Sequence, residues 1–200
     1  MSALNDLYAE IAACQKCGLA KGRTHTVPGE GPKNATLMFI GEAPGFHEDR
    51  QGRPFVGAAG EFLEELLSSI GLRREEVYIC NVIKCRPPNN RDPLFTEIEA
   101  CRPYLDRQIE LINPRVIITL GRFSMARFFP QSNISKIHGQ PKKVGNRVII
   151  PVYHPAAALH QSRYKADIER DFLKIPQIIQ DLDAVDESTA QEKPEQLSLF

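Results

Sequence analysis

The sequence contains no hydrophobic run long enough to cross a membrane. A spanning helix needs about 20 consecutive apolar residues, and the apolar runs of this 200-residue chain are far shorter. The first ten residues, MSALNDLYAE, also lack the basic segment and the apolar core of a signal peptide. We therefore expect a cytoplasmic protein with no membrane partner.

Neither sign of charge is in excess, since 25 basic residues balance 25 acidic ones. Residues 181–200 hold six of the acidic residues and one lysine, so the rest of the chain has 24 basic and 19 acidic residues. A weakly basic body permits a polyanionic partner without requiring one. We expect one domain over residues 1–180, monomeric, followed by a disordered acidic tail over residues 181–200.

Cysteine is scarce and odd in number, which argues against a framework of disulfides. Cys14 and Cys17 form a C-x-x-C pair, and Cys85 and Cys101 flank a proline-rich loop. Four thiolates brought together can hold zinc or an iron–sulfur cluster, and unrelated buried cysteines are the alternative. Cys80 lies inside an apolar run and is expected to be a buried thiol.

Hydrophobic periodicity predicts strands that alternate with helices. Strands are predicted at residues 37–40, 77–83, 115–120 and 147–152, helices at 2–13, 60–70, 96–112, 123–128 and 163–179, and a loop at 136–146. Thr96 and Glu99 match a capping box for the third of these helices. The alternation is typical of a doubly wound α/β fold with a parallel sheet.

Polar residues lie on or directly after three of the predicted strands. The first strand is followed by GEAPG, which contains Glu42. Asn81 lies in CNVIKC on the second strand, and His154 follows the fourth. In open α/β sheets, ligands bind at the carboxyl ends of the strands. A carboxylate, an amide and an imidazole there can read and polarise a small polar ligand, and Phe55 can stack on it.

Each of these residues also has a purely structural interpretation. GEAPG is equally typical of a Gly-Pro turn with a solvated glutamate. Asn81 can be a turn residue, His154 a helix cap and Phe55 a core residue, and the spacing does not choose between the interpretations.

Five separated features occur in order: GEAPG, GRPFVG, CNVIKCRPPNNRDP, HPAAAL, and the cysteines at 14, 17, 85 and 101. Over about residues 7–180 the set resembles the family 4 uracil-DNA glycosylases, the iron–sulfur members of the uracil-DNA glycosylase superfamily. The resemblance implies an α/β fold, a four-stranded parallel sheet with helices on both faces. It also implies a structural [4Fe-4S] cluster bound by Cys14, Cys17, Cys85 and Cys101.

The resemblance further implies a monofunctional enzyme that releases uracil from DNA and leaves an abasic site, which starts base-excision repair. Phe55 would stack on the flipped uracil, and the Asn81 amide would bond to its N3–H and O4. His154, as a neutral donor, and backbone N–H groups near Glu42 and Ala43, next to Gly41, would stabilise charge on the leaving base. Glu42 would position or activate water.

The remaining motif residues are expected to face DNA. Asn89 and Arg91 would support the active site or contact phosphate. The segment after His154 would enter the minor groove, which makes Ala156, Leu159 and His160 candidates for the wedge. His160 stands where relatives often carry arginine.

Two other functions are compatible with these motifs. A related branch of the superfamily traps uracil-DNA covalently and carries a KRRIH insertion after the second-strand motif, but no such insertion follows Cys85. We therefore favour turnover over covalent capture. A non-catalytic iron–sulfur DNA-binding module is the other alternative.

The chain ends in a short apolar motif. Gln196, Leu197, Leu199 and Phe200 resemble the pentapeptide that binds the bacterial DNA polymerase sliding clamp. A frayed terminus is the alternative, but a motif on an acidic tether can dock while the domain searches DNA. The motif predicts a bacterial protein associated with the nucleoid.

Overall fold

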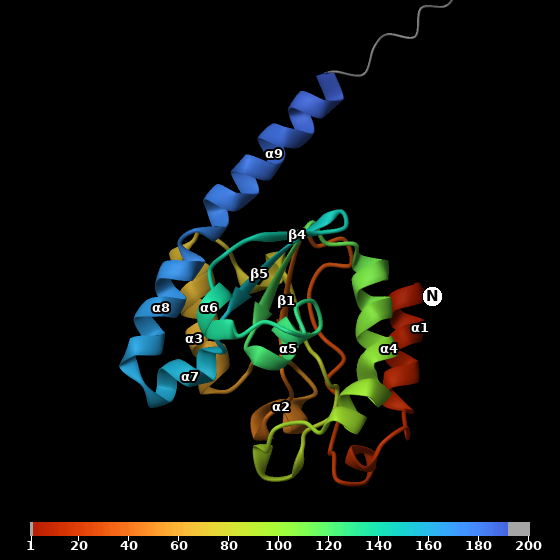
Figure 1. Cartoon of the computed structure of the whole chain (residues 1–200). Helices are drawn as coiled ribbons and strands as arrows, with labels where there is room; N and C mark the ends of the chain where they lie inside the picture. The colour runs from red at the N-terminus through yellow and green to blue at the C-terminus, as the bar shows by residue number, and fades with distance from the viewer. Residues whose placement is uncertain (1, 192–200) are drawn as a thin grey trace, which may run out of the picture.

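The computed structural model describes residues 2–191, which form a five-stranded sheet with helices on both faces (Figure 1). The strands are β1 (Leu37–Gly41), β2 (Tyr78–Asn81), β3 (Val116–Leu120), β4 (Lys142–Val144) and β5 (Arg147–Val152), in the order β2-β1-β3-β5-β4. The four predicted strands are parallel, which confirms the fold class.

The fifth strand was not predicted. β4 pairs antiparallel with β5 at the edge of the sheet, and the short helix α6 (Ile134–Ile137) precedes it. The predicted loop at residues 136–146 is therefore wrong over these segments. Two of the three β4 residues are lysines, so the strand has no hydrophobic alternation that would reveal it.

Alternate strand residues separate the core into two layers. Met38 and Ile40 face one layer, with α1 (Ala3–Ala12) and α4 (Phe95–Ile112). Leu37 and Phe39 face the other, with α3 (Ala58–Ser69) and α8 (Ser162–Phe172). Figure 1 shows these helices on opposite sides of the sheet. Each such buried side chain contributes about 1.5–3 kcal/mol, so the two layers fix the sheet that carries the site.

Helix α4 begins earlier than the sequence predicts. Its N-terminal cap is Leu94, whose N–H donates to Glu97 at 2.8 Å. The predicted capping box of Thr96 and Glu99 is therefore wrong. Arg91 binds the Glu97 carboxylate with both terminal nitrogens, which fixes that side chain at the first turn.

The C-terminal helix also differs from the prediction. It is divided into α8 and α9 (Ile175–Gln191), so residues 181–191 of the expected tail are helical. Ile178, Ile179 and Leu182 pack against the second core layer, and Asp183 pairs with Arg115 at 2.5 Å. These contacts hold α9 against the domain as far as Asp183. No helix within residues 2–191 is long and apolar enough to cross a membrane.

Candidate active site

The parallel strands bring the predicted site residues to one edge of the sheet. Gly41 pairs with Asn81 at the ends of β1 and β2, and Leu120 pairs with Val152, two residues before His154. A Cβ at Gly121, whose φ is +96°, would lie 3.1 Å from the Cβ of His154. Glycine at this position therefore leaves space for the histidine.

An open cleft of about 550 Å³ lies at this edge, a volume in the range of small-molecule sites. It lies between α2 (Phe46–Gln51), the start of α3, the loop after β2, and α7 (Pro155–His160). The predicted site residues that line it are Glu42, Ala43, Phe55, Asn81, Arg91, His154, Ala156 and Leu159. Gly41, Asn89 and His160 are not among the lining residues.

Asn81 offers a hydrogen-bond acceptor to the cleft. The residue is 1% exposed, and its Oδ1 has no partner among the described residues. A Cβ at Gly41 would lie 2.4 Å from this oxygen and 2.6 Å from Phe55 Cζ, so glycine there lets the amide and the ring pack closely. An unpaired buried acceptor costs about 1–3 kcal/mol. A ligand with an N–H donor would remove that cost.

Phe55 forms a wall of the cleft in a rare backbone conformation. Its φ is +52°, in a region that costs a bulky residue about 1–3 kcal/mol. Its ring stacks on the imidazole of His154, with centroids 5.6 Å apart and planes at 24°. The ring also belongs to the second core layer. The core and ligand-binding interpretations of Phe55 are therefore compatible.

His154 is both a helix cap and a hydrogen-bond donor. Its Nδ1 accepts from the N–H of Ala156 at 3.1 Å at the start of α7. Burial lowers the pKa of His154 to about 4, against the opposing effect of Glu48. The ring is therefore neutral at pH 7, and because Nδ1 accepts, Nε2 carries the proton. The cap thus fixes the tautomer and leaves Nε2–H as a donor.

Glu42 lies partly buried directly after β1. Burial, and to a lesser extent the charge of Asp92, raise the pKa of its carboxyl to about 7 against the opposing effect of Arg122. Arg122 is itself paired with Asp92. A carboxyl group that titrates near neutral pH suits proton exchange with water.

The loop after β2 presents Arg91 and Asn90 to the cleft. The guanidinium of Arg91 is paired with Glu97 at 2.9 and 2.7 Å, so its charge is already balanced within the protein. Asn89, with φ +55°, is exposed, and its neighbour Asn90 lines the cleft instead. On α7, Leu159 is 51% exposed at the cleft, and His160 is exposed outside it.

A second pocket holds the four predicted cluster ligands. Cys14, Cys17, Cys85 and Cys101 line one pocket between α1, the following 3-10 turn, the loop after β2, and α4. Arg23 donates to the sulfur of Cys85 and the N–H of Lys84 to that of Cys101, both at 3.3 Å. Cys80 is buried in β2 and does not line the pocket.

The four cysteines can be compared with the ligand sets of known metal sites. Within residues 2–191, no three His, Cys, Asp or Glu side chains converge as the ligands of one ion do. Zinc requires such convergence, at about 2.3 Å from each sulfur. An iron–sulfur cluster is held by four cysteine thiolates around a larger group. The four cysteines share one pocket, and four thiolates can hold either zinc or an iron–sulfur cluster.

The comparisons with known proteins agree with this geometry. The model of the uracil DNA glycosylase superfamily matches residues 28–175. The chain is 48% identical over 188 residues to the type-4 uracil-DNA glycosylase of Sulfurisphaera tokodaii, covering 89% of this chain and 86% of the relative. The chain belongs to the type-4 uracil-DNA glycosylases.

Two further type-4 uracil-DNA glycosylases show similar identity. That of Archaeoglobus fulgidus is 49% identical over 187 residues, which cover 89% of this chain and 94% of the relative. That of Saccharolobus solfataricus is 50% identical over 185 residues, which cover 87% and 86%. In each case the match covers nearly the whole domain.

Sequence reasoning missed Glu48 in this type-4 chain. Its Oε1 accepts from the N–H groups of Val56 and Gly57, at 2.9 and 3.0 Å, beside the Phe55 wall. Its Oε2 accepts from the N–H of Gly45 at 3.1 Å. The available signal was a glutamate three residues after a glycine N-cap at Gly45, where a capping side chain is expected. The predicted clamp-binding residues Gln196, Leu197, Leu199 and Phe200 lie outside the described residues.

Proposed function

We propose that this protein is a monofunctional uracil-DNA glycosylase, which hydrolyses the N-glycosidic bond of uracil in DNA and so starts base-excision repair. The names of its type-4 relatives support the activity. The observation that carries the proposal is the buried Asn81 Oδ1, which has no partner among residues 2–191 and belongs to a residue that lines a cleft of about 550 Å³.

Recognition requires the base to leave the DNA stack. The flipped ring would lie against Phe55, and Asn81 Oδ1 would accept from uracil N3–H while the amide N–H donates to O4. Cytosine presents an acceptor at N3 and a donor at C4, so it would face the amide with the wrong pattern. The Asn81 amide is thus the selective contact.

Cleavage leaves negative charge on the base and positive character on the sugar. His154 Nε2–H, fixed by the Nδ1 bond to Ala156, would donate to uracil O2 together with backbone N–H groups near Glu42 and Ala43. Ionised Glu42 would position the water and favour the cationic sugar. The proton of the water passes to the carboxylate as the new C–O bond forms.

The exposed residues beside the cleft would contact the DNA. Leu159 is the candidate wedge because it is half exposed at the cleft, and Ala156 and His160 flank it on α7. Arg91 would support the loop through Glu97, and Asn89 would approach the backbone from that loop.

We also propose that Cys14, Cys17, Cys85 and Cys101 hold a [4Fe-4S] cluster. Their shared pocket supports it, and the cluster would join α1 and α4 beside the loop that carries Arg91. Visible absorbance and iron analysis test this proposal. Stoichiometric iron and inorganic sulfide are expected, whereas a colourless protein loaded with zinc would overturn it.

One assay separates turnover from the two alternatives. The protein is incubated with an oligonucleotide that contains one uracil, and the products are separated on a denaturing gel with and without alkali. We expect strand scission only after alkali treatment. An adduct that survives denaturation would instead identify covalent trapping, and binding without either product would identify a non-catalytic module.

A separate proposal concerns the C-terminal motif. The residues Gln196, Leu197, Leu199 and Phe200 would dock on the sliding clamp of a bacterial DNA polymerase, which would bring a monomeric cytoplasmic enzyme to nucleoid DNA. Deletion of residues 196–200 is expected to abolish clamp binding and to leave uracil excision unchanged. Unchanged clamp binding would refute the proposal.

A further inference from the structure

Phe55 is an unusual residue for its backbone conformation. Within residues 2–191, the non-glycine residues with positive φ are Asn89, Asn90, Asn113 and Phe55. Asparagine tolerates the left-handed region, whereas an aromatic residue stays there only if its surroundings hold it. The conformation matters because it directs the ring into the cleft against His154.

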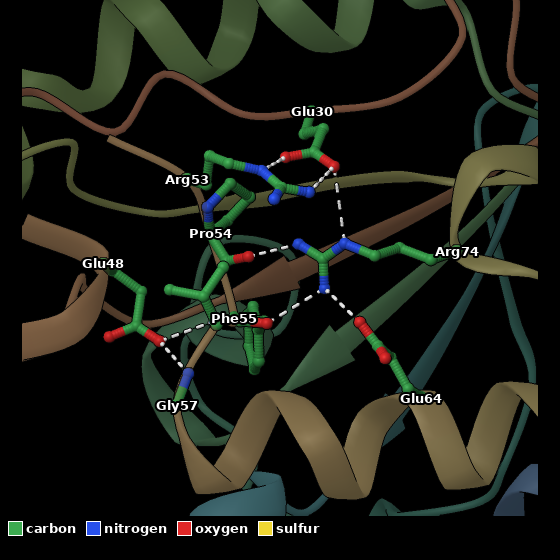
Figure 2. A network of polar contacts seen from close by, with 9 residues as sticks. Glu30, Glu48, Arg53, Pro54, Phe55, Gly57, Glu64 and Arg74 are labelled. Atoms are coloured by element: carbon green, nitrogen blue, oxygen red, sulfur yellow. Dashed lines mark hydrogen bonds and ion pairs between the residues drawn. The ribbon is translucent and has the colours of Figure 1, made fainter. Parts of the chain in front are cut away.

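Arg74, from outside the cleft, holds this backbone. Its guanidinium donates to the carbonyl oxygen of Phe55 at 2.9 Å and to that of Pro54. Figure 2 shows Arg74 reaching both carbonyls from one side, while Glu48 contacts the N–H groups that follow Phe55 from the other. The backbone around Phe55 is therefore held from two sides. Arg74 binds the carbonyls of Pro54 and Phe55, and Glu48 accepts from the N–H groups of the next two residues.

Arg74 is itself held firmly. Its side chain is 13% exposed, and it pairs with Glu30 and Glu64, each at 3.4 Å. Helix α3 encloses the same carbonyl, since a Cβ at Gly60 would lie 2.0 Å from Phe55 O. A carbonyl in this position has no room to turn while Arg74 is present.

We propose that Arg74 is a positioning residue for uracil. By binding the Pro54 and Phe55 carbonyls, it keeps Phe55 in the left-handed conformation and so sets the plane on which the flipped base stacks. Arg74 does not line the cleft, so its effect is exerted through Phe55. The inference rests on the proposed excision activity.

Arg53 provides a matched control in the same network. It forms a bidentate pair with Glu30 at 2.7 Å but donates to neither the Pro54 nor the Phe55 carbonyl, and its side chain is 54% exposed. Arg53→Gln removes one positive charge beside Glu30, as Arg74→Gln does. The two variants therefore differ in the contacts with the Pro54 and Phe55 carbonyls, and also in the pair with Glu64 and in side-chain burial.

A double-mutant cycle between Arg74→Gln and Phe55→Ala tests the proposal. Misplacement of a binding group by about 1 Å can cost about 10²-fold in rate, so we expect kcat/KM for uracil excision to fall about 10- to 100-fold in Arg74→Gln. Arg53→Gln should stay near the wild-type value. In the Phe55→Ala background, Arg74→Gln should have little further effect because the ring it positions is absent.

Several results would overturn the proposal. A wild-type rate in Arg74→Gln, or an equal loss with and without Phe55, would show that Arg74 does not act through the ring. If Arg74→Gln does not fold, Arg74→Lys keeps the charge but cannot span both carbonyls and serves in its place.

Binding to an oligonucleotide with 2′-fluoro-deoxyuridine, whose glycosidic bond resists cleavage, gives a readout independent of turnover. If the wild type binds this probe without excising uracil, the proposed function fails, while weaker binding by Arg74→Gln than by Arg53→Gln still supports the positioning role. Equal binding by the two variants overturns it.

Discussion

In the cleft, several groups are held in states that cost free energy. Asn81 has a buried acceptor with no partner in the described part of the chain, Phe55 has a φ of +52°, and the pKa of Glu42 is raised to about 7. In the cysteine pocket, by contrast, the sulfurs of Cys85 and Cys101 accept hydrogen bonds from Arg23 and from the N–H of Lys84. The cleft thus carries strained and unpaired groups, as functional sites often do, although Gln108 Oε1, Thr119 Oγ1 and Arg147 Nε are also buried without a partner elsewhere in residues 2–191. The difference is that a ligand with an N–H donor would remove the cost at Asn81, whereas two of the cysteine sulfurs already accept hydrogen bonds from the protein.

The largest expected effect is a loss of excision rate without a loss of stability, on substitution of His154. His154→Asn removes the imidazole donor but keeps a good N-cap residue for α7. The excision rate should fall about 10²- to 10³-fold, with a melting temperature close to that of the wild type. His154→Ala should lose both the rate and some stability. Single-turnover kinetics and thermal unfolding measure the two effects, and a near-normal rate in His154→Asn would contradict the role of the donor.

At the cysteine pocket, by contrast, we expect a substitution to lower the stability of the protein. Cys101→Ala should lose the visible absorbance and iron of the cluster and should lower the melting temperature by several degrees, since metal-binding free energy contributes to folding. Cys80→Ala is the control, because Cys80 is also buried but does not line the pocket. Full iron content in Cys101→Ala would exclude it as a ligand.

The third prediction concerns the pH dependence of the cleft. Because the pKa of Glu42 is raised to about 7 and the ionised form acts, the single-turnover rate should fall about tenfold per pH unit below pH 7. His154 has a pKa of about 4, so it stays neutral over the same range. Glu42→Gln should be slow and nearly independent of pH. A wild-type rate that is constant from pH 5 to 8 would refute the assignment.

The smallest expected effect is a gain in stability when the Glu42 carboxyl is replaced. The pKa of Glu42 is raised in the folded protein, so the protonated form is favoured and stability is lost as the pH rises through about 7. Glu42→Gln should therefore melt about 2–4 °C higher than the wild type at pH 8, as expected for about 1 kcal/mol. Below pH 5 the two proteins should melt alike. Equal melting temperatures of the two proteins at pH 8 would indicate that ionised Glu42 does not destabilise the folded protein.

The sequence predicted the elements whose residues are buried in regular patterns. The four parallel strands are continuous apolar runs, so their ends, with Glu42, Asn81 and His154, could be assigned to one edge of the sheet. β4 was missed because it is short and rich in lysine, and the extension of α9 depends on contacts with distant residues.

The residues that hold the backbone of the cleft were less predictable from the sequence than the residues that line it. Glu48 and Arg74 act on backbone groups 8 to 20 residues away in the sequence, and no local pattern records such contacts. The left-handed conformation of Phe55 is also invisible in the sequence, since phenylalanine rarely adopts it. Residue types at strand ends thus reveal the chemistry, whereas the geometry that holds them requires the structure.

The effect of Asn81→Ala on the turnover of the enzyme tests the central claim most directly. The measurement counts the uracil released per protein molecule from an oligonucleotide in excess, for the wild type and for Asn81→Ala. We predict many uracils per wild-type molecule and a rate about 10²-fold lower in the variant, because the buried amide is the selective contact. Release of no more than one uracil per wild-type molecule, or equal rates in the two proteins, would contradict the account.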